Sequence, residues 1–248
     1  MSAVQQMSAR PAVRSRAAPC AWPLTIATYN IHGAVGSDGR FSPLRVAGVL
    51  QEIDADIVAL QEVPLGGGHM ANVVSLLQSV TGLHAAAART CTIAGRGYGN
   101  AILSRYPIES TRALDISFGS REPRGALDAD ISCHGHPMRV IATHLGLSPA
   151  ERRDQVKRLL QVFDTEEMPV ILLGDVNEWF MWGKPLRWLV SHFQSVPAPR
   201  TFPSRWPLFA LDRIWIRPRH RLQSVRAHSS LLARLASDHL PLVARIQE

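Results

Sequence analysis

Short apolar runs and segments of helical periodicity alternate along the chain. Ten apolar runs have the length and composition of β-strands, and they cover residues 24–30, 57–60, 90–94, 100–103, 124–131, 138–143, 170–173, 211–216, 224–227 and 240–246. A first helix is expected after Ser42-Pro43, because four apolar residues then recur on one helical face, namely Val46, Val49, Leu50 and Ile53. Glycines at 66–68 break the chain before a second helix predicted over residues 70–80.

The segment that begins at Ser148 carries the clearest helix signal. Ser148-Pro-Ala-Glu151 has the spacing of a capping box with proline at the first helical position. An apolar stripe follows at helical spacing, made of Val156, Leu159, Leu160 and Phe163. Because strands and helices alternate in each half while hairpin-like neighbours also occur, we predict one mixed-sheet α/β domain over residues 23–248.

Composition is that of a globular protein with a basic leading segment. Hydrophobic residues make up 46% of the 248 positions, which is enough for a sizeable core. No apolar run approaches the roughly 18 residues that a membrane helix needs. Residues 1–22 contain three arginines and no acid, and we interpret them as a disordered basic N-terminal extension.

The three cysteines, Cys20, Cys91 and Cys133, show no paired spacing and are odd in number. We therefore expect no disulfide framework, buried structural thiols at Cys91 and Cys133, and a reducing compartment. A cytoplasmic monomer is the working expectation.

The net charge of +7 favours an anionic partner such as nucleic acid, a phosphorylated metabolite or lipid headgroups. The alternative is a general richness in arginine, since Lys157 and Lys184 are the only lysines. Both interpretations remain open on charge alone.

Polar residues suited to phosphate or metal chemistry follow several of the predicted strands. The segments are Thr28-Tyr-Asn-Ile-His32, Leu60-Gln-Glu-Val63, Ala142-Thr-His-Leu145, Leu173-Gly-Asp-Val-Asn-Glu178, Leu211-Asp-Arg-Ile214 and Ser237-Asp-His-Leu240. Strand ends are where α/β proteins gather catalytic groups on a rigid scaffold. Together the six segments indicate a metal-assisted phosphoester hydrolase.

Asp175 and Asn177 are the sharpest pair, because alternation along an extended backbone places them on the same side. A carboxylate there can align and deprotonate a water, and a neutral amide can hold phosphate. The alternative is an Asx turn after the strand. Glu62 suits a hard cation such as Mg²⁺, with Asn30 and Asp238 as neighbouring candidates.

Other residues are candidates by type and position. Asp212 and His239 are the expected charge pair, in which the acid fixes the imidazole tautomer. His144 can donate to a phosphate oxygen, and His32 and Arg124 are candidate substrate contacts. For residues 179–182, Trp-Phe-Met-Trp, we favour a helix packing on the sheet over base stacking or insertion into a lipid interface.

From about Leu24 to the C-terminus, these motifs and their order resemble the endonuclease/exonuclease/phosphatase superfamily. The resemblance implies a four-layered α/β sandwich of two packed mixed β-sheets flanked by helices. It further implies Mg²⁺, with Mn²⁺ as a possible substitute, and in-line attack of an activated water on phosphorus.

Residue by residue, the resemblance implies a role for each motif position. Glu62 would be the main metal ligand, with Asn30 and Asp238 beside it. Asp175 would act on the water, and the phosphate would be held by Asn177, His144 and His239, the last supported by Asp212. Asn100 falls near the site. His32 stands where abasic-site enzymes carry an acid, so that specificity is not expected.

We therefore predict a Mg²⁺-dependent phosphodiesterase or nuclease, with nucleic acid as the favoured substrate. The alternatives are a phosphomonoesterase for a small phosphorylated metabolite, a phospholipid-headgroup hydrolase and a catalytically silent binding module.

Overall fold

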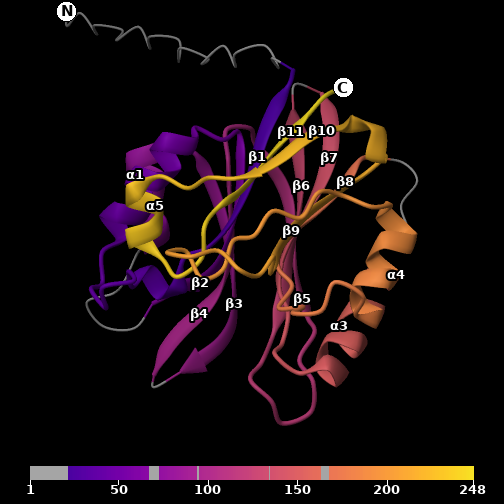
Figure 1. Ribbon diagram of the computed structural model, residues 1–248. Coiled ribbons are helices and arrows are strands. Elements are labelled where there is room, and N and C mark those ends of the chain that lie inside the picture. The colour runs from indigo at the N-terminus through magenta and orange to yellow at the C-terminus, as the bar shows by residue number, and fades with distance from the viewer. Residues whose placement is uncertain (1–21, 67–72, 94, 134, 163–167) are drawn as a thin grey trace, which may run out of the picture.

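Two β-sheets lie face to face, and helices cover the outer face of each (Figure 1). The computed structural model describes residues 22–66, 73–93, 95–133, 135–162 and 168–248. The first sheet has six strands in the order β10-β11-β1-β2-β4-β3, and the second has five in the order β5-β6-β7-β8-β9. The first sheet therefore joins strands from distant parts of the chain, whereas the second is built from consecutive strands.

The strands are β1 (Leu24–Asn30), β2 (Ile57–Pro64), β3 (His84–Ile93), β4 (Arg96–Ser104), β5 (Ile108–Asp115), β6 (Gly125–Cys133), β7 (His136–His144), β8 (Val170–Asp175), β9 (Asp212–Arg217), β10 (Leu222–Ala227) and β11 (Leu242–Ile246). The α-helices are α1 (Pro43–Ile53), α2 (Val73–Thr81), α3 (Pro149–Val162), α4 (Lys184–Phe193) and α5 (Leu231–Ala236). Two short 3₁₀ turns, His32–Ala34 and Arg219–Arg221, complete the described elements.

Both sheets are mixed, and each has one parallel pair near its centre. β1 runs parallel to β2 with Asn30 opposite Gln61, and β7 runs parallel to β8 with His144 opposite Asp175. The other described pairs are antiparallel. Because parallel strands end at the same edge, polar residues from each pair gather there.

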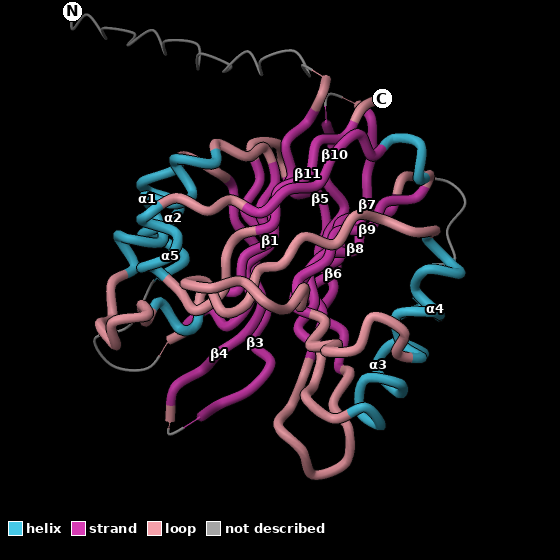
Figure 2. The backbone as a smooth tube through the Cα atoms, viewed as in Figure 1, coloured by secondary structure: helices cyan, strands magenta, loops and turns pink. Residues whose placement is uncertain are grey.

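Alternation along the strands separates the core into three apolar layers. Figure 2 shows the strands in the middle of the molecule and the helices on its two outer sides. On β1, Ile26 faces the second sheet, whereas Ala27 faces the helical layer of α1, α2 and α5. α3 and α4 pack on the outer face of the second sheet. This arrangement confirms the predicted four-layered α/β sandwich.

The helices follow their predicted caps and stripes where the structure describes them. Ser148 and Glu151 exchange the two hydrogen bonds of a capping box at the start of α3. Val156 and Leu159 are buried on its inner face, and Phe163 lies outside the described residues. Residues 70–72 of the second predicted helix also lie outside them, and α2 is described from Val73.

Several strand predictions were too short. β2 does not end before Glu62 but continues to Pro64 through an irregularity in its pairing with β4. β3 begins at His84, and β5 had no predicted counterpart because its exposed positions carry mostly polar residues. Sheet pairing holds these segments extended in spite of weak local patterns.

The expected helix over residues 179–182 is wrong. α4 begins only at Lys184, after Gly183, with Pro185 in its first turn, where its missing N–H costs no helical hydrogen bond. Residues 179–182 themselves are exposed instead of packing on the sheet.

The predicted extension over residues 1–22 lies outside the described residues, apart from Trp22, which packs on the core between the sheets. Cys133 is buried as expected, but Cys91 is only half-buried. None of the described helices is both long enough and apolar enough to span a membrane.

Candidate active site

A cleft of about 460 Å³ opens at the edge where β1, β2, β7 and β8 end. Eight of the residues predicted from sequence line it: His32, Glu62, Asn100, Arg124, His144, Asp175, Asn177 and His239. Asn30 and Asp212 lie behind this lining and reach it through hydrogen bonds. The six sequence segments therefore converge on one place.

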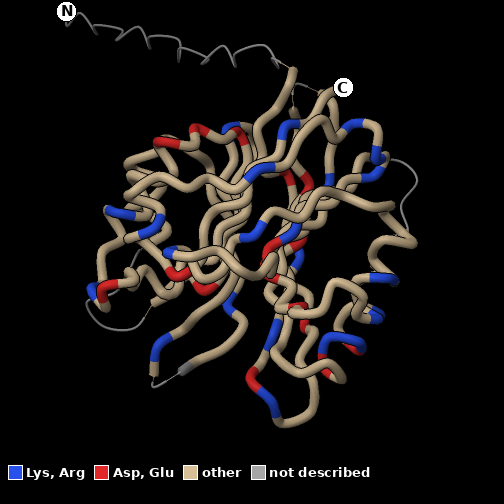
Figure 3. The backbone as a smooth tube through the Cα atoms, in the orientation of Figure 1, with Lys and Arg blue, Asp and Glu red and all other residues tan. Residues whose placement is uncertain are grey.

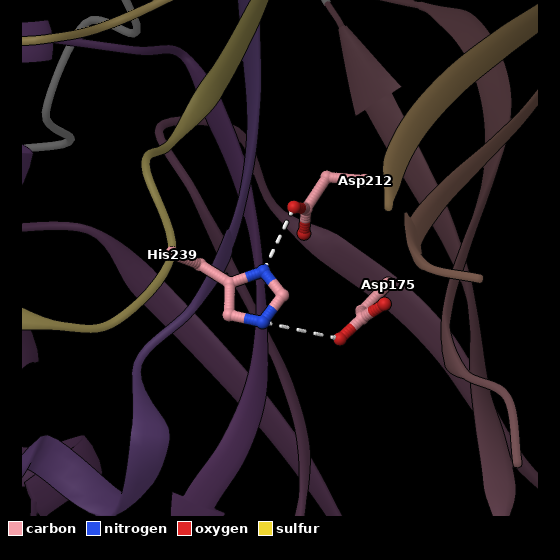
Figure 4. Close-up of side chains that lie close together, drawn as sticks. All are labelled: Asp175, Asp212 and His239. Carbon is pink, nitrogen blue, oxygen red and sulfur yellow. Dashed lines mark hydrogen bonds and ion pairs between the residues drawn. The ribbon is translucent and has the colours of Figure 1, made fainter. Parts of the chain in front are cut away.

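The imidazole of His239 lies between two buried carboxylates (Figure 4). Its Nδ1 is 2.9 Å from Asp212 Oδ2, and its Nε2 is 3.6 Å from Asp175 Oδ2. Asp212 also accepts a hydrogen bond from Thr201 Oγ1. The predicted Asp212–His239 contact is thus formed, and the free ring nitrogen faces Asp175.

Asp212 and Asp175 set the protonation state of His239. Burial lowers the pKa of His239, but the charges of Asp212 and Asp175 outweigh burial and raise that pKa to about 10. His239 is therefore an imidazolium at neutral pH. Burial raises the pKa of Asp175 to about 7, with His239 acting in the opposite direction. A carboxyl group with that pKa can take up and release a proton near neutrality.

Backbone geometry fixes where Asp175 points. Gly174 has a φ of 149°, and a Cβ there would lie 1.9 Å from the carbonyl oxygen of Thr143 on the neighbouring strand. The Asn177 N–H donates to Asp175 Oδ1 over 2.9 Å, which is the Asx turn considered as an alternative. The turn and the proposed chemistry are compatible, because the turn leaves Asp175 Oδ2 directed into the cleft.

Asn30 links the two sheets through its side-chain amide. Its Nδ2 donates to Glu62 Oε1 over 3.0 Å and to Asp175 Oδ2 over 3.1 Å, while its Oδ1 accepts from the His32 N–H. The nitrogen of Asn30, not its oxygen, therefore faces the candidate metal ligand. The amide holds the two carboxylates at a fixed separation.

His144 is a neutral imidazole with a contact at each ring nitrogen. Arg124 Nη1 lies 2.9 Å from His144 Nδ1, and Asn177 Nδ2 lies 3.0 Å from His144 Nε2. The same Nε2 is 3.5 Å from Asp175 Oδ2. Burial, together with the charge of Arg124, lowers the pKa of His144 well below its ordinary value. His144 can therefore donate one hydrogen bond without carrying charge.

Glu62 offers a partly exposed carboxylate in the cleft. It adopts a φ of 54° in the irregular part of β2, and its side chain is 34% exposed. Left-handed backbone at non-glycine residues is costly and is concentrated at functional sites. His32 and Asn177, which also line the cleft, have φ values of 48° and 49°.

Two groups could hold a cation, and their chemistry distinguishes them. Asp175, Asp212 and His239 are close enough to ligate one ion. However, an imidazolium has no free lone pair, and Asp212 Oδ2 already accepts two hydrogen bonds. Glu62 has a carboxylate oxygen available as a ligand next to Asp175, so it fits a hard cation such as Mg²⁺ better than the Asp175–Asp212–His239 group does. Asp238 is 37% exposed, and its carboxylate faces His32 Nδ1 at 3.8 Å.

The other predicted substrate contacts already have protein partners. Asn100 Nδ2 donates across the sheets to the Gly125 carbonyl over 2.8 Å, which fixes the residue next to Arg124. Arg124 is almost buried and contacts His144 and Glu122. Its guanidinium therefore orients His144 as well as lining the cleft.

Sequence reasoning missed the buried ion pair behind the site. Arg152 Nε and Nη2 contact the two carboxylate oxygens of Glu178 at 3.1 and 3.2 Å. Its Nη1 donates to the carbonyls of Gly146 and Leu147, just after His144. A signal was present, because Arg152 lies four residues before Val156 on the apolar stripe of α3. No sequence pattern marked Thr201.

Comparisons with known proteins identify relatives of this chain. The model of the endonuclease/exonuclease/phosphatase family matches residues 27–239. The chain is 32% identical to the uncharacterized protein YbhP of Escherichia coli K12, over 89% of this chain and 95% of YbhP.

Solved structures share the fold at lower identity. An endonuclease/exonuclease/phosphatase from Beutenbergia cavernae DSM 12333 has a TM-score of 0.76 at 21% identity, over 91% of this chain and 71% of that one. The mannosyl-6-phosphatase Bt3783 of Bacteroides thetaiotaomicron has a TM-score of 0.68 at 19% identity, over 89% and 98%. On the family match and the identity to YbhP, this chain belongs to the endonuclease/exonuclease/phosphatase family of phosphoesterases.

Proposed function

We propose that this protein is a Mg²⁺-dependent phosphodiesterase. The observation that carries the proposal is the position of Asp175, whose Oδ2 lies 3.6 Å from the imidazolium of His239 and 3.1 Å from the Asn30 amide. A proton acceptor and a proton donor thus share one cleft, as hydrolysis by an activated water requires.

In the proposed reaction, a water oxygen forms a bond to phosphorus while the bond to the leaving oxygen breaks. Asp175 accepts the proton of the water. His239 gives its Nε2 proton to the leaving oxygen and is held in place by Asp212 through Nδ1. Asn177 and neutral His144 donate to the non-bridging oxygens, where negative charge develops.

Glu62 would hold the metal ion, with Asp175 next to it. When bound, Mg²⁺ supplies positive charge at the phosphate oxygens and orients the substrate. The oxygen donors and partial exposure of Glu62 support this assignment.

The test uses bis(4-nitrophenyl) phosphate with Mg²⁺ as a soluble diester. Asp175→Asn should lower kcat by about 10² to 10⁴-fold, the range for a lost general base, with an unchanged thermal unfolding midpoint. Asp54→Asn, at an aspartate with 83% side-chain exposure, is the matched control and should retain activity. Full activity of Asp175→Asn would refute the assignment. Faster hydrolysis of 4-nitrophenyl phosphate than of the diester would favour the phosphomonoesterase alternative.

The metal assignment has a readout that does not depend on activity. A ligand that binds only the folded state raises its unfolding midpoint. Mg²⁺ should therefore raise the midpoint of the wild-type protein, and Glu62→Gln should abolish this shift. Glu122→Gln, at another carboxylate lining the cleft, should preserve it. An equal shift in Glu62→Gln would place the metal elsewhere.

A further inference from the structure

An exposed apolar surface borders the cleft, and the proposed reaction does not use it. It consists of residues 179–182, Trp-Phe-Met-Trp, together with Trp206, Leu208 and Phe209, and is called the apolar rim below. Trp182 is 75% exposed and Trp206 is 79% exposed. Contiguous exposed apolar residues of this size commonly mark interaction surfaces.

The two segments of the apolar rim form one surface. The ring of Trp179 lies 4.8 Å from that of Phe209, centroid to centroid. Met181 and Leu208 line a common groove of about 240 Å³. Trp179 also contacts Phe202, whose ring lies 4.8 Å from that of His239. The apolar rim is therefore continuous with the wall of the candidate active site.

Hydrogen bonds hold the backbone of the apolar rim in place. The Gly183 N–H donates to the Phe180 carbonyl over 3.0 Å, and the Phe209 N–H donates to the Phe202 carbonyl over 2.8 Å. Arg205, at the tip of the 202–209 turn, donates to the Ser37 carbonyl. Ordered backbone thus presents these side chains outward.

The chain segment that carries the apolar rim bears charged side chains of one sign only. The 33 residues from Trp179 to Leu211 contain Lys184, Arg187, Arg200 and Arg205 but no aspartate or glutamate. Figure 3 shows Lys and Arg, without Asp or Glu, along α4, which follows the apolar rim. Glu178, just before it, is neutralised by Arg152 in the interior. An anionic partner fits this surface.

We propose that the apolar rim docks the protein onto a lipid surface with anionic headgroups. Tryptophan favours the boundary between headgroups and acyl chains, and neighbouring cations attract anionic lipid. Base stacking by nucleic acid would use the rings but leave Met181 and Leu208 without an apolar environment. A second copy would bring two positively charged surfaces together.

Docking does not depend on the proposed hydrolysis. If the protein both docks on lipid and hydrolyses phosphodiesters, the cleft lies beside the headgroups. A lipid phosphodiester then becomes the expected substrate class in place of nucleic acid, and this step rests on the proposed function.

The experiment measures co-sedimentation with vesicles in excess EDTA, so that no turnover contributes. Wild-type protein should bind vesicles of phosphatidylglycerol and phosphatidylcholine in equal parts and bind pure phosphatidylcholine more weakly. The Met181→Ser/Trp182→Ser variant should bind the mixed vesicles at least about tenfold more weakly, since two large apolar side chains are lost. Leu44→Ser is the control: Leu44 is 64% exposed, as Met181 is 63% exposed, but it lies on α1, outside the apolar rim.

Further measurements separate docking from folding and from catalysis. Brominated lipid in the mixed vesicles should quench the tryptophan fluorescence of the wild-type protein. The double variant should hydrolyse soluble bis(4-nitrophenyl) phosphate at the wild-type rate. Absence of wild-type binding to the mixed vesicles, or equal binding by the double variant, would overturn the proposal. So would a rim-dependent dimer, or tight rim-dependent binding of a single-stranded oligonucleotide without vesicle binding.

Discussion

At the scale of residues, the candidate site is a set of charges arranged so that each one sets the protonation of its neighbour. Asp212 lies on the Nδ1 side of His239 and Asp175 lies on the Nε2 side. Arg124 lies on the Nδ1 side of His144, and its positive charge, together with burial, lowers the pKa of that histidine. Two histidines in one cleft are therefore held in different states, one charged and one neutral.

Removing the charge of Asp212 should lower the pKa of His239. In Asp212→Asn the pKa of His239 should fall by about 1 to 3 units, because burial then has less opposition. Imidazole ¹⁵N chemical shifts recorded as a function of pH in the metal-free protein measure this directly. Asp130→Asn, at the partner of Arg112 on β6, should leave the titration unchanged. An unaltered His239 titration in Asp212→Asn would contradict the electrostatic account.

The same pKa predicts how stability depends on pH. The folded-state pKa of His239, about 10, lies above its ordinary value of 6.5. The contribution of charged His239 to the free energy of unfolding is therefore fully present below pH 6.5, and it is lost as the pH rises through about 10.

The identity of these residues and the Asp212–His239 pair could be predicted from sequence, but the other contacts of the site could not. A polar residue next to an apolar run is a local pattern, and it identified Glu62, Asp175 and His239. The contact between Asn30 and Asp175 joins positions 145 residues apart, and no local pattern specifies which amide atom faces the acid. The roles of Arg124 and Asn100 as supports likewise depend on contacts across the fold.

At the scale of elements, α3 supports the loops that carry the chemistry. Arg152 joins the segment after His144 to Glu178, the residue after Asn177. Glu151 and Gln155 continue this buried polar network to the N–H of Gly146. Periodicity predicted the helix and its cap, but an arginine on the buried face requires a partner from another element, which periodicity does not reveal. β5 was missed for a related reason, since only its neighbour β6 holds it extended.

Breaking the buried pair should be costly. Arg152→Gln leaves the carboxylate of Glu178 buried without its partner, and we expect a loss of about 3–5 kcal/mol in the free energy of unfolding. Urea unfolding measures this loss, and kcat for the soluble diester should fall as the two loops loosen. Arg158→Gln removes the exposed pair with Asp154 on the same helix and should cost less than about 1 kcal/mol. Similar losses in the two variants would argue against a supporting role for α3.

At the scale of the whole molecule, the first sheet takes strands from both ends of the chain and the second takes strands from the middle. β11 pairs with β1, so the last strand completes the sheet that the first one begins. The resemblance of the motifs predicted this layered architecture. Local patterns alone could not have given it, because they do not specify which strands pair.

The leading segment should be dispensable for hydrolysis. Deleting residues 1–21 removes Arg10, Arg14 and Arg16 but keeps Trp22 and every described contact of the cleft. We expect kcat and KM for the soluble diester to stay within about twofold of wild type, as for loss of a peripheral terminal segment. Deleting residues 1–30 instead removes β1 and Asn30 and should prevent folding. Inactivity of the shorter deletion would mean that this segment contributes to the site.

The contacts that join Asn30 to Asp175 and Asn100 to Gly125 all cross the seam between the two sheets. The proposed catalysis therefore depends on how the two sheets are aligned, because each sheet carries only part of the candidate site. A small sliding of one sheet over the other would separate acid from amide while leaving each sheet intact. A compound wedged into this seam, far from any phosphate, would be expected to inhibit without competing with substrate.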